Sequence, residues 1–178
     1  MSERQIDWIQ TYSGMEFYPL APEGSPITIL DIAHALALTC RFGGHCTSFY
    51  SVAQHSVLVS ESVPDEHALT ALLHDAAEAY LVDIPKPIKR GIPEWSTFED
   101  RVQSRILARY DCPALPLDPS IKLADLRALA TERRDLMADG PVWGSWIQSV
   151  EPFESRIDPW SPERSERQFL DRFFELYP

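Results

Sequence analysis

The sequence lacks any apolar run close to 18 residues, and its first dozen residues lack the charged-then-apolar pattern of a secretory signal. We therefore expect no membrane association and a cytoplasmic location. Cysteine is also scarce. Cys40, Cys46 and Cys112 are odd in number and lack the short paired spacing of a thiolate metal site, so reduced structural thiols are expected.

Positive charge is in short supply as well, with 16 Lys and Arg against 27 Asp and Glu. A protein that binds a nucleic-acid polymer presents a basic surface to the phosphate backbone, so this balance argues against such a partner. A small anionic substrate can still be attracted to a local basic spot. No internal repeat or strong linker divides the chain, and 178 residues suffice for a single domain over 1–178.

Apolar residues recur mostly at helical spacing, which predicts an all-α fold of about six or seven helices. The expected helices cover about 28–40, 51–62, a segment starting at Asp65, 95–110, 119–137 and a last one announced by Ser161-Pro162-Glu163. Prolines and glycines in 1–26 predict an extended N-terminal arm or turns. Two prolines in 83–89 predict a rigid connector, and 138–160 is expected to be an irregular loop.

Titratable side chains interrupt the most apolar of the expected helices at His74, Asp75 and Glu78. On a helix His74 and Glu78 are spaced i,i+4, and Asp75 and Glu78 are spaced i,i+3, so all three serve one small volume. A buried ionisable group needs a partner or a metal ion. A hydrogen-bonded His-Asp pair would satisfy the dyad taken alone, whereas the whole pattern favours a metal site.

One helix cannot complete a coordination sphere, so further ligands must come from other segments. His55 lies in an apolar stripe of the preceding helix, and Asp125 has core-like neighbours in the penultimate long helix. Together with His74 and Asp75 they make two imidazoles and two carboxylates. This set leaves room for waters and fits Mn, Co, Fe, Ni or Mg better than a closed structural zinc site, with Zn retained as a candidate for an open site.

In order and local context, His55, the His74-Asp75 pair and Asp125 resemble the pattern of the HD-domain metal-dependent phosphohydrolases. The string over 72–89 is similar to the branch of bacterial and phage 5′-deoxynucleotidases, which also includes deoxynucleoside triphosphate triphosphohydrolases. The resemblance covers about residues 31–136 and implies an HD-domain helical bundle. Phe42 stands where the better-known deoxynucleotidases carry Trp, and the interval between the two histidines is shorter, so base preference and phosphate number stay open.

The resemblance also implies residue roles. His55, His74, Asp75 and Asp125 would bind the metal ion. Glu78 would be the general acid or base. Asp83 would orient the sugar or the leaving group. Two alternatives stay open, because Glu78 could instead fix the tautomer of His74 and Asp83 could cap a turn before Pro85.

Substrate contacts are expected from the segments on either side of His55. By resemblance, Arg41 would hold phosphate oxygens and Phe42 would contact the nucleoside. His45 follows two glycines and could approach the phosphates, while Lys86 and Lys89 could neutralise β- and γ-phosphates. The alternatives are a helix C-terminal cap for Arg41, core packing for Phe42 and surface positions for the others.

Three classes of function follow. The first is a nucleotide phosphohydrolase that releases a nucleoside plus phosphate or triphosphate, including a triphosphohydrolase dedicated to one deoxynucleotide such as dATP. The second is other HD-type chemistry, such as cyclic-dinucleotide cleavage or a di-iron oxygenase. The third is a regulatory domain that binds metal or nucleotide without turnover. By resemblance the protein is expected to form a homo-oligomer.

Overall fold

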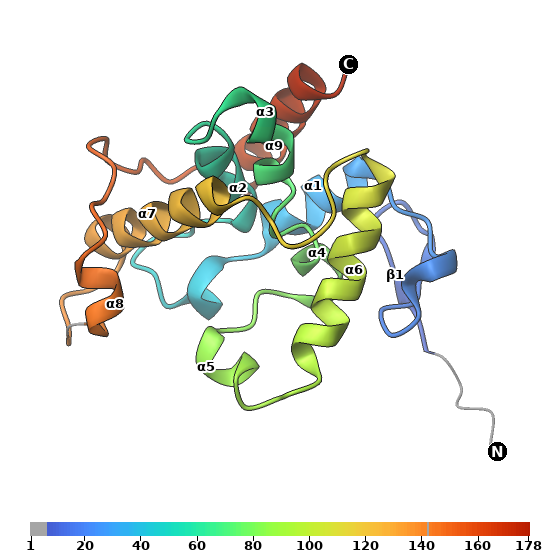
Figure 1. Ribbon diagram of the computed structural model, residues 1–178, viewed down its shortest axis with the longest axis horizontal. Coiled ribbons are helices and arrows are strands. Elements are labelled where there is room, and N and C mark those ends of the chain that lie inside the picture. The colour runs from blue at the N-terminus through green and yellow to red at the C-terminus, as the bar shows by residue number, and fades with distance from the viewer. Residues whose placement is uncertain (1–6, 142) are drawn as a thin grey trace.

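The computed structural model describes residues 7–141 and 143–178, and within them the fold is all-α apart from one small hairpin (Figure 1). In chain order the elements are β1 (Ile9–Gln10), β2 (Glu16–Phe17), the 3-10 helix η1 (Pro22–Gly24), α1 (Ile29–Leu38), the 3-10 segment η2 (Arg41–Gly44), α2 (Val52–Ser60), α3 (Asp65–Leu72), α4 (Glu78–Leu81), α5 (Lys86–Lys89), α6 (Trp95–Arg109), α7 (Pro119–Leu136), α8 (Ser145–Gln148) and α9 (Pro162–Leu176). Three of these helices, α4, α5 and α8, have only four residues. The remaining six in the described part of the chain correspond to the predicted helices, although α3 ends earlier than expected.

Side-chain caps fix where the main helices begin. The hydroxyls of Thr28, Ser51 and Ser161 each accept a hydrogen bond from a backbone N–H in the first turn of α1, α2 and α9. Pro162 lies in the first turn of α9, where a missing N–H is tolerated. Such caps typically contribute about 1 kcal/mol each, so the polar residues that precede these helices select their register.

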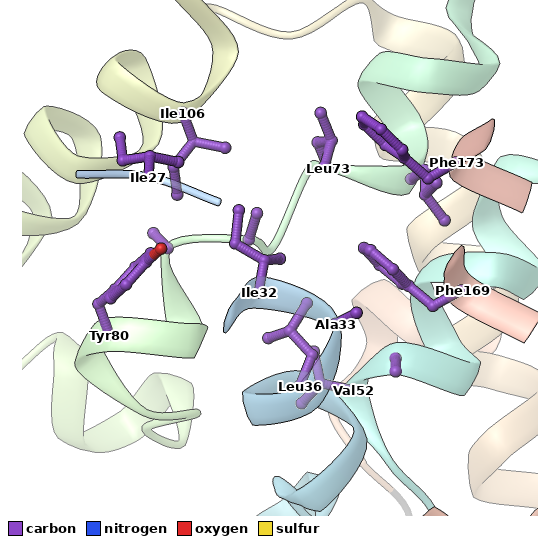
Figure 2. Packing of buried hydrophobic residues seen from close by; sticks show 14 of the residues in the cluster. Ile27, Ile32, Ala33, Leu36, Val52, Leu73, Tyr80, Ile106, Phe169 and Phe173 are labelled. Carbon is purple, nitrogen blue, oxygen red and sulfur yellow. The ribbon is translucent and has the colours of Figure 1, made fainter. Parts of the chain in front are cut away.

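The hydrophobic core lies where α1, α2 and α9 meet. Ile32 and Leu36 of α1, Phe169 of α9 and Leu73 after α3 are completely buried, and Figure 2 shows Leu73 and the side chains from α1 and α9 converging. Each such side chain contributes roughly 1.5–3 kcal/mol through its removal from water. A second buried cluster joins α2, α3 and α7. Helix α2 therefore packs into both clusters, and His55 on it is fully buried.

The N-terminal segment folds back on the body and is not an extended arm. Strands β1 and β2 pair antiparallel, and Phe17 is completely buried with its ring stacked 3.8 Å from that of Tyr80. Arg101 of α6 donates to the carboxylate of Glu23 and to the carbonyl of Leu20. The predicted turns are present, while residues 1–6 of this prediction lie outside the described residues.

The predicted third helix is interrupted, which corrects the expectation that it carries the His-Asp dyad. Helix α3 ends at Leu72, and residues 73–77 form a turn that leads to α4. His74 Nδ1 lies 2.7 Å from the carbonyl of Ala71, the group that would accept from the Asp75 amide in a continuing helix. Asp65 also lies in the first turn of α3 and not at the cap, which is Pro64.

Two other irregular segments contain short helices. Within 83–89 the chain forms the single turn α5, with Pro87 near its start, where a helix needs no N–H donor. The loop over 138–160 contains α8.

Cys40, Cys46 and Cys112 are free thiols. Among the described residues we find no helix with the length and apolar character needed to cross a membrane.

Candidate metal centre

Four side chains from three segments converge on one small volume. His55 projects from α2, His74 and Asp75 from the turn after α3, and Asp125 from α7. His55 Nε2 lies 3.3 Å from His74 Nε2 and 3.2 Å from an Asp125 carboxylate oxygen. Asp75 Oδ2 lies 3.3 Å from His74 Nε2 and 3.7 Å from His55 Nε2. The four metal ligands expected from the sequence are thus neighbours in space.

The hydrogen bonds behind the two imidazoles determine what their Nε2 atoms offer. His74 Nδ1 faces a backbone carbonyl, which can only accept, so this nitrogen carries the proton. His55 Nδ1 faces a Glu132 carboxylate oxygen at 2.6 Å and donates to it. Both Nε2 atoms therefore point into the cluster beside two carboxylates, where each can bind a proton or a metal ion. Four acceptors so close together require a proton or a metal ion between them.

The spacing of these atoms fits a single ion. One ligand atom each from His55, His74 and Asp125 lies within 4.8 Å of the others, and this group can hold a metal ion. For bonds of about 2.1 Å, adjacent donors of an octahedral site lie about 3 Å apart. The separations of 3.2–3.3 Å from His55 Nε2 agree with that value. The donor set thus matches a metal site in both chemistry and spacing.

The electrostatics of the cluster also favour a cation. Burial lowers the pKa of His74, but the charge and hydrogen bond of the neighbouring Asp75 carboxylate, together with Asp125 and the Ala71 carbonyl, outweigh burial and raise this pKa to about 9. Burial raises the pKa of Asp125, but the hydrogen bond to His55 and the positive charges of His55 and His74 together outweigh burial and lower this pKa to about 2. The carboxylates accordingly stay ionised at neutral pH, and the cluster attracts positive charge.

A buried carboxylate that the sequence prediction missed supports the cluster from behind. Glu132 of α7 is completely buried, and its two oxygens accept from His55 Nδ1 and, at 3.0 Å, from Arg41. Glu132 follows Asp125 by seven residues, which is two helical turns, so the two lie on the same face of α7. This spacing is the signal that could have identified it.

Arg41 does not cap the C-terminal end of α1. Its side chain is buried, bonds to Glu132 and lies 3.7 Å from Asp75. Burial favours loss of its proton, yet the surrounding carboxylates, Glu132 foremost, raise the pKa of Arg41 above its ordinary value. A permanently charged guanidinium therefore stands next to the candidate metal ligands.

Glu78 is buried at the start of α4, with one oxygen engaged and the other free of hydrogen bonds. Oε1 lies 3.3 Å from Lys89 Nζ, and buried Oε2 has no partner among the described residues. Burial, followed by the negative charges of Asp75 and Asp83, raises the pKa of Glu78 well above its ordinary value. A carboxyl with a raised pKa suits proton transfer.

A cavity of about 360 Å³ opens on the cluster, with Asp75 and Asp125 in its wall. This volume falls within the range of small-molecule sites. Three cationic side chains, Arg41, Lys86 and Lys89, also line it. Asp83 lines the same cavity. This arrangement is consistent with the sequence prediction that these residues face one site.

Aromatic side chains form another part of the cavity wall. Phe42, Trp143 and Trp146 line it, and the rings of Phe42 and Trp143 lie 6.0 Å apart. Phe42 has a φ of 57°, in the left-handed region, and Gly43 follows with 59°. Trp143 and Trp146, which were not among the site residues predicted from the sequence, thus contribute to the cavity wall.

The expected substrate residue His45 lies elsewhere. Its side chain is exposed at the end of η2 and does not line the cavity beside the metal cluster. The turn through Gly43 and Gly44, both with positive φ, carries the chain away after Phe42. The structure therefore does not bring His45 together with the other candidates.

Comparison with known proteins places the chain in a family. No family model matches it. Over 174 residues it is 43% identical to the uncharacterized protein YfdR of Escherichia coli (strain K12), and the match covers 96% of each protein. The chain belongs to the YfdR family. It is also 37% identical over 131 residues to an uncharacterized protein of Rhodobacter capsulatus, covering 66% of this chain and 67% of that protein. The names of these two relatives state no activity.

Proposed function

We propose that this member of the YfdR family is an HD-domain, metal-dependent phosphohydrolase that cleaves the 5′ phosphate ester of deoxynucleotides or nucleotides. The products would be a nucleoside and either phosphate or triphosphate. The observation that carries the proposal is the cluster of His55, His74, Asp75 and Asp125 at the wall of a cavity lined by cations and aromatic rings.

The donor set would hold one divalent ion of Mn, Co, Fe, Ni, Zn or Mg, because two imidazoles and two carboxylates leave coordination positions for water and substrate. A bound ion would polarise a phosphoryl oxygen and lower the pKa of a bound water. Arg41 stands beside Asp75 with its guanidinium toward the same cavity and can hold phosphate oxygens. Lys86 supplies a second positive charge to the cavity.

Glu78 fits the role of the group that moves a proton. Its Oε2 is buried without a partner, and its raised pKa lets it carry a proton to a leaving oxygen. Asp83 lies in the same wall and is placed to accept a hydrogen bond from a sugar hydroxyl. These two carboxylates thus supply proton transfer and orientation at one reaction centre.

The aromatic side of the cavity supports a nucleoside as the second part of the substrate. Phe42, Trp143 and Trp146 offer flat apolar faces, on which a nucleobase can stack at about 1–3 kcal/mol per base. Cations and aromatic rings in one cavity wall match a molecule with an anionic end and an aromatic end. A nucleotide has both.

The test is product analysis by chromatography. Metal-stripped protein receives Mn²⁺, Co²⁺ or Mg²⁺ and is incubated with each deoxy- and ribonucleoside mono- and triphosphate. Phosphate released from monophosphates identifies a 5′-nucleotidase, and intact triphosphate identifies a triphosphohydrolase. Glu78→Gln should retain the metal and lose turnover, which separates catalysis from simple metal binding. Absence of hydrolysis with every metal and nucleotide would contradict the proposal.

A further inference from the structure

Lys89 was expected from the sequence to bind phosphates, but its ammonium group is already engaged by two carboxylates. Lys89, at the end of α5, lies 3.3 Å from Glu78 Oε1 and forms a close ion pair with Glu99 in the second turn of α6. The side chains of Glu78, Lys89 and Glu99 are 8%, 21% and 29% exposed, so the three charges form a partly buried row.

The row runs from the surface of α6 inward to the candidate catalytic carboxyl. Glu99 holds Lys89, and Lys89 holds Oε1 of Glu78, which leaves Oε2 as the oxygen without a hydrogen bond. A partly buried ammonium between two carboxylates keeps a defined position, because leaving either partner exposes an unpaired charge. The side chain of Glu78 consequently has one anchored and one available oxygen.

Lys86 provides the contrast on the same short helix. It lines the same cavity as Lys89, its side chain is exposed, and no carboxylate pairs with it among the ion pairs of the described residues. An unpaired cation can turn toward an anionic substrate without breaking an ion pair. The two lysines of α5 therefore differ in environment, because Lys89 is paired with carboxylates and Lys86 is not.

We propose that Glu99 and Lys89 are positioning residues, which hold the Glu78 carboxyl in place through the row Glu99–Lys89–Glu78, and that Lys86 is the lysine of α5 that meets the substrate phosphate. This inference rests on the proposed function for its kinetic consequence. The row itself is a property of the folded protein and has a test that needs no turnover.

The kinetic test compares Lys89→Met with Lys86→Met in the metal-loaded full chain, using the best nucleotide substrate. Lys89→Met should lower kcat by about tenfold or more, since a displaced catalytic group is costly, and leave KM within about twofold. Lys86→Met should raise KM, because it removes a substrate contact. A rise in KM from Lys89→Met would return Lys89 to the role of phosphate ligand and overturn the inference.

Glu99 is tested through its dependence on Lys89. Glu99→Ala should lower kcat in the native background and have no further effect in the Lys89→Met background, because Glu99 acts only through the lysine. Lys89→Arg, which can still bridge both carboxylates, should recover part of kcat. The exposed Glu66→Ala serves as control and should leave kcat and KM unchanged. Equal effects of Glu99→Ala in both backgrounds would contradict the row.

A urea unfolding cycle tests the row without any substrate. The effects of Glu78→Gln and Glu99→Ala on the free energy of unfolding should be non-additive when Lys89 is present and additive when it is Met. Coupling without hydrolysis by the native protein would support the row and contradict the phosphohydrolase proposal. Additivity in both backgrounds would overturn the row, whatever the activity.

Discussion

His55 donates a hydrogen bond of 2.6 Å through Nδ1 to Glu132, and both side chains are completely buried. This contact fixes the imidazole tautomer and turns Nε2 toward the other three candidate ligands. Arg41 balances the charge of the carboxylate on its other side. The candidate metal centre and the guanidinium of Arg41 are therefore held by one buried glutamate.

Removal of the Glu132 charge should weaken metal binding. Glu132→Gln retains the shape of the side chain but makes the His55 imidazole less basic and leaves Arg41 without its main carboxylate partner, so affinity should fall about 10- to 100-fold. Competition with a chromophoric chelator measures this. Glu151→Gln, an exposed change beyond α7, is the matched control. Unchanged affinity in Glu132→Gln would show that the bond to His55 does not tune the site.

Metal addition should stabilise the folded protein, because the four clustered acceptors exist only in the native state. At a metal concentration of 100 times Kd the gain is about 2.7 kcal/mol, and chelation should reverse it. Thermal unfolding with and without Mn²⁺ measures this shift. His74→Ala should abolish the shift, whereas the exposed His45→Ala should retain it. A similar shift in both variants would indicate binding elsewhere.

Val82 should respond to substitution by glycine with a gain in stability. It joins α4 to the segment that carries Asp83, with φ 63° and ψ 157°, a region that is essentially restricted to glycine, and its side chain is 60% exposed. Val82→Gly should raise the free energy of unfolding by about 1 kcal/mol. Glycine relieves the backbone strain of the folded protein, and this gain is partly offset because glycine also gives the unfolded chain more conformational freedom. Urea unfolding measures this. Val82→Ala keeps the Cβ atom and should give a smaller gain. An equal gain in the free energy of unfolding from Val82→Ala would show that the backbone conformation of residue 82 is not strained.

Asp135 should make stability depend on pH. Its side chain is 3% exposed and accepts hydrogen bonds from Arg134, from Arg156 and from the backbone N–H of Ile157, which ties the loop after α8 to the end of α7. The hydrogen bond from Arg134 is the main cause that lowers the pKa of Asp135 below 3.8. The stabilisation is complete above 3.8 and is lost as pH falls through the lowered pKa of the folded protein.

Asp135→Asn should therefore cost about 1–2 kcal/mol at neutral pH and progressively less in acid, where the native aspartate is protonated too. Urea unfolding over a series of pH values measures both chains. A difference that stays constant as pH falls through 3.8, or that grows, would contradict the assigned charge state.

The helices were predictable from local signals, whereas the interruption at the dyad was not. Caps at Thr28, Ser51 and Ser161 and the apolar spacing fixed the long helices. The break after α3 depends on a side chain, His74, that bonds to the carbonyl of Ala71, and helical periodicity does not report such competition. The high helix propensity of the alanines and leucines around this break favours a continuous helix.

The candidate metal ligands were predictable because polar side chains in apolar stripes stand out one by one. The pairing behind them was not, since Glu132 bonds to Arg41, a residue 91 positions away in the sequence. Lys89 illustrates the same limit. Its charge predicts an anion nearby, but only the packing of α5 against α6 shows that the anion is Glu99.

We propose that His55, His74, Asp75 and Asp125 together bind one metal ion. The most direct measurement is an anomalous difference map from crystals of the protein soaked in Mn²⁺, recorded near the manganese edge. The account predicts a single strong peak at about 2.1 Å from both histidine Nε2 atoms and close to the two aspartates. A cluster without a peak in Mn²⁺-saturated crystals, or a peak only at other residues, would contradict it.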